Sequence, residues 1–508
     1  MRLRIGLIGE TTASEQIIRQ LGCNYKIIQQ ADEISFGEYN ALICSGKIAD
    51  YRQALERFDS LGGAIIFDAI AYGNFLQAPL PGAWVKSLHP SSADFDFIDA
   101  LDIYSKLYLS KKPKLIYLDK GLRLKIDARK IVLPFDMENF WDDHRIRRKK
   151  FPADRKELAS ERVAACTKGN LRKIIWRCLE ILHDKQGLPL VQKWYFPQPQ
   201  KTHFIFRVDT DFCSEQQAND LYQLCQKYKI PGTWFVDTQD FNRLENCYAK
   251  MEDQEVGLHC WHHLVFAGKD QNYRNLQKGS KHLLEAGIDY IGFAAPLGEW
   301  NSGLQESIVE TGFEYSSEFG YDYDNFPLFP NSESAVMQIP IHPISTGRLR
   351  RSHFSIAEMK KYYLNVFEQN LANSEITIFY HHPSHPHLEV FEAIFKMINE
   401  KVIPVSSMAD FQEWWLARDK IKAGVSVNEK TISIDTDGDI FWRIYKNNQE
   451  AIVAKSLEID LDNCKFKPVS RQNIDGKAAR RFSWRDLLYD YETARGKKYM
   501  KRKIKDSL

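Results

Sequence analysis

Two carboxylates stand two residues apart at the end of an apolar run, in Phe206-Arg207-Val208-Asp209-Thr210-Asp211. Two histidines four residues apart, His259 and His263, follow a second apolar run, and His262 offers an alternative spacing of three. One carboxylate and two imidazoles can hold a divalent metal and leave coordination positions open, as a hydrolytic site requires. The remaining acid could then accept a proton.

A third apolar run, Ile378-Phe379-Tyr380, ends in the pair His381-His382. Each motif has an ordinary explanation by itself. Asp-x-Asp is commonly a turn or a helix cap, and histidines four residues apart share one helix face without binding anything. Their common order favours function, because the carboxyl ends of parallel strands meet at one edge of a barrel. The three runs therefore predict one converging site.

Length and composition set the broad class of the protein. A chain of 508 residues predicts two to four domains, and 44% hydrophobic with 27% charged residues is typical of a soluble globular protein. The net charge of +2 gives no reason to expect a nucleic-acid partner. Nine scattered cysteines without a Cys-x-x-Cys pair indicate a reducing compartment. Because no apolar run resembles a signal peptide or spans a bilayer, we expect a cytoplasmic protein.

Residues 1–95 alternate strands, at 5–8, 41–44 and 64–68, with helices at 14–21 and 51–61. This alternation predicts a small doubly wound α/β domain with a parallel sheet. The segments Tyr39-Asn40-Ala41-Leu42-Ile43 and Leu61-Gly62-Gly63 make it similar to the flavodoxin-like domain of glutamine-amidotransferase-type proteins. Cys44 lacks a Gly-x-Cys-x-Gly elbow, so we expect it to be buried and not nucleophilic.

The rest of the chain changes character three times. Residues 96–200 form a connector, with short strands at 114–118 and 130–133 and a helix at 170–183. The connector also contains a basic run at 145–150. We expect this run to be a solvated loop, and the alternative is a patch that binds an anionic ligand. Residues 201–418 repeat strands and helices, with strands at 203–208, 233–236, 255–258, 290–294, 336–339, 375–380 and 402–405, which predicts a distorted (β/α) barrel, complete or incomplete. Residues 424–470 alternate apolar and polar side chains and predict a small β-sheet module, and residues 471–508 are a basic tail.

Residues 201–418 resemble the polysaccharide deacetylase domain, also called the NodB-homology or carbohydrate esterase family 4 domain. Asp209-Thr210-Asp211 is a spaced variant of the family's adjacent acid pair, and His259-Cys260-Trp261-His262-His263 has Cys260 at the family's Ser/Thr position. Ala294-Ala295-Pro296 corresponds to the Arg-x-Pro motif, but the family's arginine, which orients the base, is missing. The run that ends at His381-His382 corresponds to the last motif.

The resemblance implies a metal-dependent hydrolase that removes an N-acetyl group from an N-acetylated sugar, polysaccharide or glycolipid precursor. It implies that Asp211, His259 and His263 bind the metal, that Asp209 is the base, and that His382, or otherwise His381, is the acid. Zinc is the expected metal, although cobalt, nickel or iron also suit these ligands. Side chains expected to line the substrate cleft, with packing roles as the alternative, are Trp261, Pro296, Glu299, Trp300 and His342.

Several alternatives stay open. Arg207 lies two residues before Asp209, hence on the same strand face, and either supplies the missing charge or is a structural ion pair. The same fold could serve an amidohydrolase of a small cyclic amide, or a glycan-binding protein without activity. One carboxylate with two histidines also occurs in non-haem iron oxygenases. The basic tail, with its apolar neighbours, is either a contact with an anionic membrane surface at the inner face or a solvated terminus.

Overall fold

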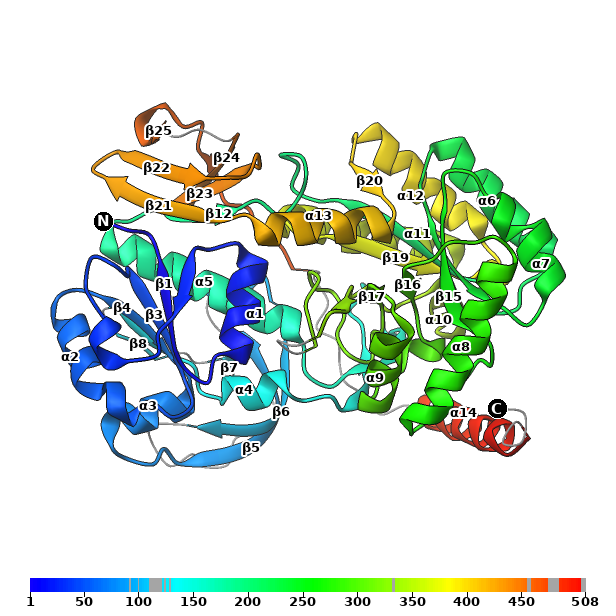
Figure 1. Ribbon diagram of the computed structural model, residues 1–508, viewed down its shortest axis with the longest axis horizontal. Helices are drawn as coiled ribbons and strands as arrows, with labels where there is room; N and C mark the ends of the chain where they lie inside the picture. The colour runs from blue at the N-terminus through cyan, green and yellow to red at the C-terminus, as the bar shows by residue number, and fades with distance from the viewer. Residues whose placement is uncertain are drawn as a thin grey trace. The chain divides into compact units, whose positions relative to one another are not determined.

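The computed structural model describes residues 1–90, 93–98, 100–108, 121–122, 125–127, 129–330, 334–454, 458–473 and 484–503 (Figure 1). The chain forms two compact units, each built from three segments. Unit 1 contains Met1–Asp143, Ala165–Lys201 and Trp414–Asn473, and unit 2 contains His144–Ala164, Thr202–Glu413 and Ile474–Leu508. The predicted connector is therefore divided between the units. Its predicted strand at 114–118 lies outside the described residues.

The main sheet of unit 1 has six strands in the order β2-β1-β3-β4-β9-β8. Its strands are β1 (Ile5–Gly9), β2 (Tyr25–Ile27), β3 (Ala41–Ser45), β4 (Ala64–Phe67), β8 (Lys125–Asp127) and β9 (Lys130–Val132). All neighbouring strands are parallel except β8 and β9. The chain adds β2 on one side of β1 and β3 and β4 on the other, so the strand order reverses at β1, as in a doubly wound sheet. The apolar runs of β1, β3 and β4 are buried as expected, whereas β2 was not predicted. The flavodoxin-like type of this domain stays a prediction.

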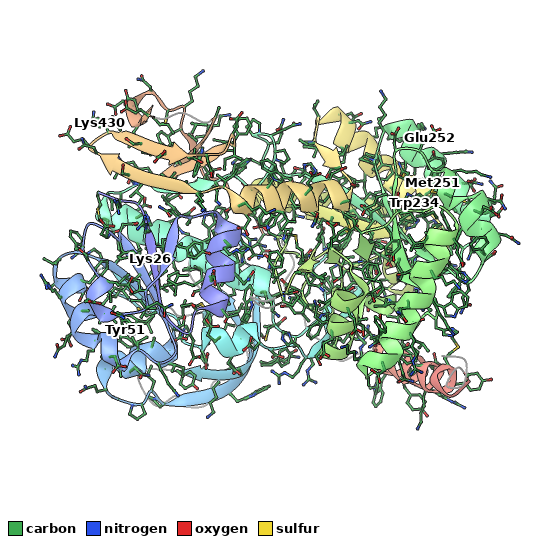
Figure 2. The ribbon with its side chains drawn as sticks, viewed as in Figure 1. Lys26, Tyr51, Trp234, Met251, Glu252 and Lys430 are labelled. Carbon is green, nitrogen blue, oxygen red and sulfur yellow. The ribbon has the colours of Figure 1, made fainter. Side chains whose placement is uncertain are left out.

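The helices of this part of the chain are α1 (Thr12–Leu21), α2 (Arg52–Ser60), α3 (Ala69–Leu76), α4 (Met137–Trp141) and α5 (Lys168–Gln186). A small second sheet contains β5 (Gly82–Pro90), β6 (Leu101–Tyr108) and β7 (Gly121–Leu122). In the main domain, Lys26 forms an ion pair with Glu33, and the Tyr51 hydroxyl donates a hydrogen bond to the Gln29 carbonyl (Figure 2). These contacts tie the segment after β2 to the start of α2.

The predicted β module contributes to two further sheets of unit 1. One sheet contains β21 (Ala423–Asn428), β22 (Thr431–Thr436) and β25 (Glu458–Asp460). The other contains β23 (Trp442–Lys446), β24 (Gln449–Val453), β26 (Lys467–Pro468) and β12 (Leu190–Lys193), which comes from the predicted connector. Val191 of β12 and Leu3 near the amino terminus belong to the same buried cluster as Ile432 and Trp442. The module therefore shares its core with residues far away in sequence.

Unit 2 is a curled parallel sheet in the order β18-β17-β16-β15-β14-β13-β19, with β20 also paired to β13. Its strands are β13 (Phe204–Asp209), β14 (Thr233–Asp237), β15 (Glu255–Cys260), β16 (Gly292–Phe293), β17 (Tyr315–Ser316), β18 (Met337–Gln338), β19 (Thr377–His381) and β20 (Val405–Ser406). The edge strands β18 and β19 are not paired, but the His342 amide beyond β18 donates to the Ile378 carbonyl at 3.0 Å. The unit is thus a half-barrel, the incomplete form of the predicted barrel.

The helices of unit 2 surround this sheet (Figure 1). They are α6 (Glu215–Tyr228), α7 (Phe241–Asn246), α8 (Lys269–Glu285), α9 (Ser302–Thr311), α10 (Thr346–Arg351), α11 (Ile356–Asn373) and α12 (Leu388–Glu400); α13 (Met408–Lys420) begins in this unit. Phe204 and Phe206 of β13 pack against the ring of Phe395 on α12. Trp234 in β14 and Met251, four residues before β15, are buried, whereas the neighbouring Glu252 is exposed (Figure 2).

Two segments of unit 2 differ from the sequence expectations. The basic run is not a solvated loop but strand β10 (Ile146–Lys150), antiparallel to β11 (Ser160–Ala164). Pairing with β11 satisfies its backbone, and the Arg148 guanidinium bonds both oxygens of Asp490. The tail contains helix α14 (Trp484–Lys503), whose Lys497 pairs with Glu299. No helix in the described ranges is long and apolar enough to cross a membrane.

Candidate active site

Asp211 is the centre of the polar cluster at the carboxyl edge of the half-barrel. Its Oδ1 lies 3.1 Å from Nε2 of His259 and 3.1 Å from Nε2 of His263. Its Oδ2 lies 3.2 Å from Nε2 of His382. Burial would raise the pKa of Asp211, but the three histidines hold that pKa well below its usual value. The structure therefore brings together residues that are as far as 171 positions apart in sequence.

His259 is held in one orientation by the backbone. It is in β15, its side chain is 1% exposed, and its Nδ1 lies 2.7 Å from the carbonyl oxygen of Ala294. Nδ1 must carry the proton that this hydrogen bond needs, so Nε2 is the ring nitrogen left to face Asp211. Burial lowers the pKa of His259, but the Asp211 carboxylate outweighs burial and the pKa is raised.

His263 does not share a helix face with His259, because it lies in the loop that follows β15. Asn275 of α8 fixes this loop. Its Oδ1 accepts from the His262 amide at 2.7 Å, and its Nδ2 donates to the His262 carbonyl at 3.1 Å. His262 itself contacts Gln239 and not Asp211. The loop therefore selects His263, the residue four positions after His259, to face the carboxylate.

The turn that carries Asp211 is strained and is held by the buried ion pair of Asp237 with Arg243. Asp211 and Phe212 both have left-handed backbone conformations, with φ of 42° and 58°. Asp237 at the end of β14 accepts hydrogen bonds from the Thr210 hydroxyl and the Phe212 amide. Arg243 bonds Asp237 at 2.7 Å. Non-glycine residues rarely adopt this conformation, so these contacts are what keep the turn in place.

Asp209 lies next to this cluster but has a different partner. Arg207 donates from Nε to Oδ1 at 2.7 Å and from Nη2 to Oδ2 at 2.8 Å. Nη1 of Arg207 bonds the carbonyl and the hydroxyl of Ser317 at 2.6 and 3.0 Å. The Arg207 side chain is fully buried, and Asp209 is 5% exposed. Burial would lower the pKa of Arg207, but the neighbouring Asp209 outweighs burial and raises it, so the guanidinium stays charged.

The two histidines at the end of β19 point in different directions. His382 faces the cavity beside Asp211. His381 is fully buried, where its Nδ1 lies 3.1 Å from the Thr346 hydroxyl and its ring packs on Phe391. Alternation along the strand produces this difference. His382 is therefore the one that can reach a ligand.

A cavity of about 400 Å³ opens onto this cluster. Asp209, Asp211, His259 and His382 line it, together with Tyr380 and the arginines of α10. Of the expected cleft residues, Pro296 precedes Leu297 and Gly298, which do line the cavity, and Glu299 pairs with Lys497. Three others are engaged elsewhere: Trp261 packs on His282, Trp300 packs on His144 and Tyr321, and His342 bonds Asp324 and Tyr362.

The ligand atoms of Asp211, His259 and His263 fit one divalent cation. They all lie within 4.8 Å of one another. Two imidazole nitrogens with one carboxylate oxygen suit zinc and neighbouring transition metals. The hydrogen bond of His259 to a backbone carbonyl is typical of a metal-ligating histidine. These three side chains therefore suit a metal ion by their chemistry as well as their spacing.

Sequence analysis missed the residues that support this site. Asp237, Arg243, Asn275 and Ser317 all act through contacts between different strands or helices. Asp237 alone had a signal, because it ends the strand 233–237 with a carboxylate as Asp209 ends β13. Asn275 and Ser317 are ordinary polar residues whose roles depend on tertiary placement.

Comparisons with known proteins concern part of unit 2. Residues 207–316 match the family model of polysaccharide deacetylase, a range that contains Asp209, Asp211, His259 and His263 and ends before β19. The sequence matches no curated protein.

Three solved structures illustrate the structural similarity. A Mycobacterium smegmatis protein described as a polysaccharide deacetylase has 17% identity and a TM-score of 0.38, and the match covers 44% of this chain and 94% of that one. A carbohydrate esterase family 4 pseudoenzyme from Bacillus anthracis has 14% identity and a TM-score of 0.31, covering 42% and 66%. A family 4 carbohydrate esterase from Streptomyces lividans, in complex with acetate, has 12% identity and a TM-score of 0.28, covering 40% and 91%.

Proposed function

We propose that unit 2 is a metal-dependent deacetylase that removes an N-acetyl group from an N-acetylated sugar, polysaccharide or glycolipid precursor. The match of residues 207–316 to the polysaccharide deacetylase family supports this reaction class. The observation that carries the proposal is that two neighbouring carboxylates have different partners. Asp211 faces three histidines, whereas Asp209 faces Arg207 and the same cavity. One carboxylate is thus placed to bind a cation and the other to accept a proton.

Asp211, His259 and His263 would hold the metal, and zinc is the proposed ion. When bound, it would polarise the acetamide carbonyl and bring the pKa of the attacking water towards about 7. The remaining chemistry belongs to the chain. Asp209 takes the proton that the water loses as its oxygen bonds to the carbonyl carbon. Arg207 keeps both oxygens of Asp209 in a fixed orientation.

His382 donates a proton to the amide nitrogen as the carbon–nitrogen bond breaks, because an unprotonated amine is a poor leaving group. Acetate and the free amino sugar are the products. His381 cannot replace it, because its ring is buried against Phe391 and its Nδ1 is engaged by Thr346. The wall formed by Tyr380 and Phe319 would pack against the substrate and exclude water.

The test measures metal content by elemental analysis and acetate release from N-acetylated oligosaccharides. Asp209→Asn should retain the metal and lose acetate release by a factor on the order of 100 or more, because an amide cannot accept the proton. His382→Ala should do likewise, with His381→Ala as the matched control and a smaller loss. Near-wild-type rates in both Asp209→Asn and His382→Ala would exclude this mechanism. A metal-loaded wild type that binds glycan but releases no acetate would instead be a glycan-binding protein.

We further propose that the protein is cytoplasmic and that α14 contacts the anionic inner face of the membrane, where a lipid-linked glycan would be found. Exposed apolar side chains on this helix support the contact, since Trp484 is 72% exposed, Leu488 59% and Tyr491 65%. Arg495 and Lys498 are exposed on the same helix. Basic residues beside apolar ones favour anionic lipid surfaces.

A further inference from the structure

The cavity that contains Asp209 and Asp211 also contains three arginines that deacetylation does not use: Arg348, Arg350 and Arg351. All three are on the short helix α10. The backbone at Gly347 lies against the ring of His385, where an added Cβ would be 2.4 Å from the ring. The centre of that ring is 4.4 Å from the centre of the His382 ring. Helix α10 is therefore anchored directly beside the proposed proton donor.

Arg348 already has a carboxylate partner. Its Nη2 donates to Oε1 of Glu161 at 2.9 Å, and its Nε contacts Oε2 of the same carboxylate. The Glu161 side chain is 5% exposed and that of Arg348 is 15% exposed. This pair is nearly buried and its charges balance. Its role is to fix α10 to strand β11.

Arg350 and Arg351 are different, because both are exposed and neither forms an ion pair with a carboxylate of the described residues. The guanidinium carbon of Arg351 lies 4.4 Å from the centre of the Tyr489 ring, and that of Arg348 lies 4.7 Å from it. Arg351 also hydrogen-bonds the Tyr489 side chain. Stacking uses the flat face of its guanidinium, so the N–H groups that do not reach Tyr489 stay available. The tyrosine of α14 thus orients Arg351 without neutralising it.

The charges of the cavity wall do not cancel. Its carboxylates are Glu161, Asp209 and Asp211. Glu161 is paired with Arg348, and Asp209 is paired with Arg207. Asp211 faces the three histidines. Burial of Tyr489 would raise its pKa, yet the charges of Arg348 and Arg351 lower that pKa. The wall around α10 therefore carries an excess of positive charge.

We propose that Arg350 and Arg351 bind an anionic group of the glycan, a sugar carboxylate or a phosphate, while its N-acetyl group lies at Asp209. Guanidinium groups bind both kinds of anion through two parallel hydrogen bonds. The inference rests on the proposed function, because it names the class of glycan that the deacetylase accepts. A neutral glycan leaves the two arginines without a partner and is a poorer substrate.

The test uses one N-acetylated oligosaccharide in three forms: neutral, with a uronic-acid carboxylate, and with a phosphate. Binding is measured by calorimetry on metal-loaded protein carrying Asp209→Asn, and kcat/KM on the wild type. We expect an acidic form to bind at least tenfold more tightly than the neutral form, with a preference that falls as salt rises. Adding Arg350→Gln and Arg351→Gln together should remove most of this preference, since hydrogen bonds between charged groups contribute factors on the order of 10 to 100.

Arg57→Gln, which removes an exposed arginine of α2, is the matched control and should leave the preference unchanged. Equal binding of acidic and neutral forms by the wild type would overturn the inference and leave the deacetylase proposal standing. Preferential binding of an acidic form without acetate release would support the anion site and overturn the deacetylase proposal. If the double variant does not fold, the salt dependence of the wild-type preference decides the question. The acidic form that binds more tightly identifies the anionic group.

Discussion

Replacing Arg207 with methionine separates the support of the proposed base from the support of the metal ligands. Methionine keeps an unbranched side chain and removes the guanidinium. Arg207 donates two hydrogen bonds to Asp209, at 2.7 and 2.8 Å, and two to Ser317, at 2.6 and 3.0 Å. The arginine is fully buried and the aspartate side chain is 5% exposed. The substitution therefore leaves a buried carboxylate without its cation.

Removing one partner of a buried ion pair costs about 3–5 kcal/mol, so we expect the free energy of unfolding to fall by about that amount. Acetate release should fall by a factor on the order of 100, because a misplaced catalytic group loses its alignment with the substrate. Metal content should be retained, since Asp211, His259 and His263 form no hydrogen bond with Arg207. Arg207→Lys, which keeps the charge and loses the paired geometry, should give an intermediate loss of rate.

Arg243→Met is the matched comparison, because Arg243 is also paired with a buried aspartate. Asp237, its partner, holds the turn that carries Asp211. This variant should weaken metal binding by about 10- to 100-fold, the usual effect of losing outer support at a metal site. The assays are metal content after dialysis, acetate release at saturating metal, and urea unfolding. If Arg207→Met releases acetate at the wild-type rate, or loses metal as readily as Arg243→Met, Arg207 is a structural residue only.

Three further predictions follow from other parts of the chain. His263→Ala should lose nearly all metal affinity while His262→Ala retains it, by elemental analysis; the opposite result would make His262 the ligand. Burial raises the pKa of Asp68 to about 7 and of Glu138 to about 8. Between those values and the unfolded pKa of about 4, both carboxyl groups are protonated in the folded chain and ionised in the unfolded chain. The free energy of unfolding in urea should therefore fall as pH rises from about 4 to 8, and the double variant Asp68→Asn with Glu138→Gln should flatten this slope. Full-length protein should sediment with anionic vesicles at low salt more than a chain ending at Asp475 does; equal sedimentation would show that α14 is not an anchor.

Most strands of the half-barrel could be predicted, including the short strands β16 and β18, which lie within the predicted runs 290–294 and 336–339, but β17 could not. The apolar runs of β13, β14, β15 and β19 mark strands because their side chains are buried on both faces. In contrast, β17 has only two residues, Tyr315 and Ser316, next to Glu314 and Ser317. A strand this short becomes ordered by pairing with β16 and β18, so nothing in its own sequence reveals it.

The identity of the candidate ligands was readable from the sequence, but their geometry was not. Spacing of four residues suggested one helix face for His259 and His263. The structure instead uses the end of a strand and a loop, which Asn275 holds from α8. Similarly, the sequence could not separate His381 from His382 by their surroundings. The contact of His381 with Thr346 on α10 distinguishes them, and that contact comes from a distant segment.

Arg207 bears most directly on whether the site is active. Strand alternation places Arg207 and Asp209 on one face but does not say whether they form an ion pair. What enforces the pair is enclosure, because Ser317 holds one side of the guanidinium while the rings of Phe235 and Tyr380 lie 5.2 and 5.7 Å away. Ala294, at the place of the missing family arginine, is fully buried; its carbonyl accepts from His259 and its amide donates to the Leu258 carbonyl. The cation beside Asp209 thus comes from β13, so the absence of an arginine at position 294 does not leave Asp209 without a cationic partner.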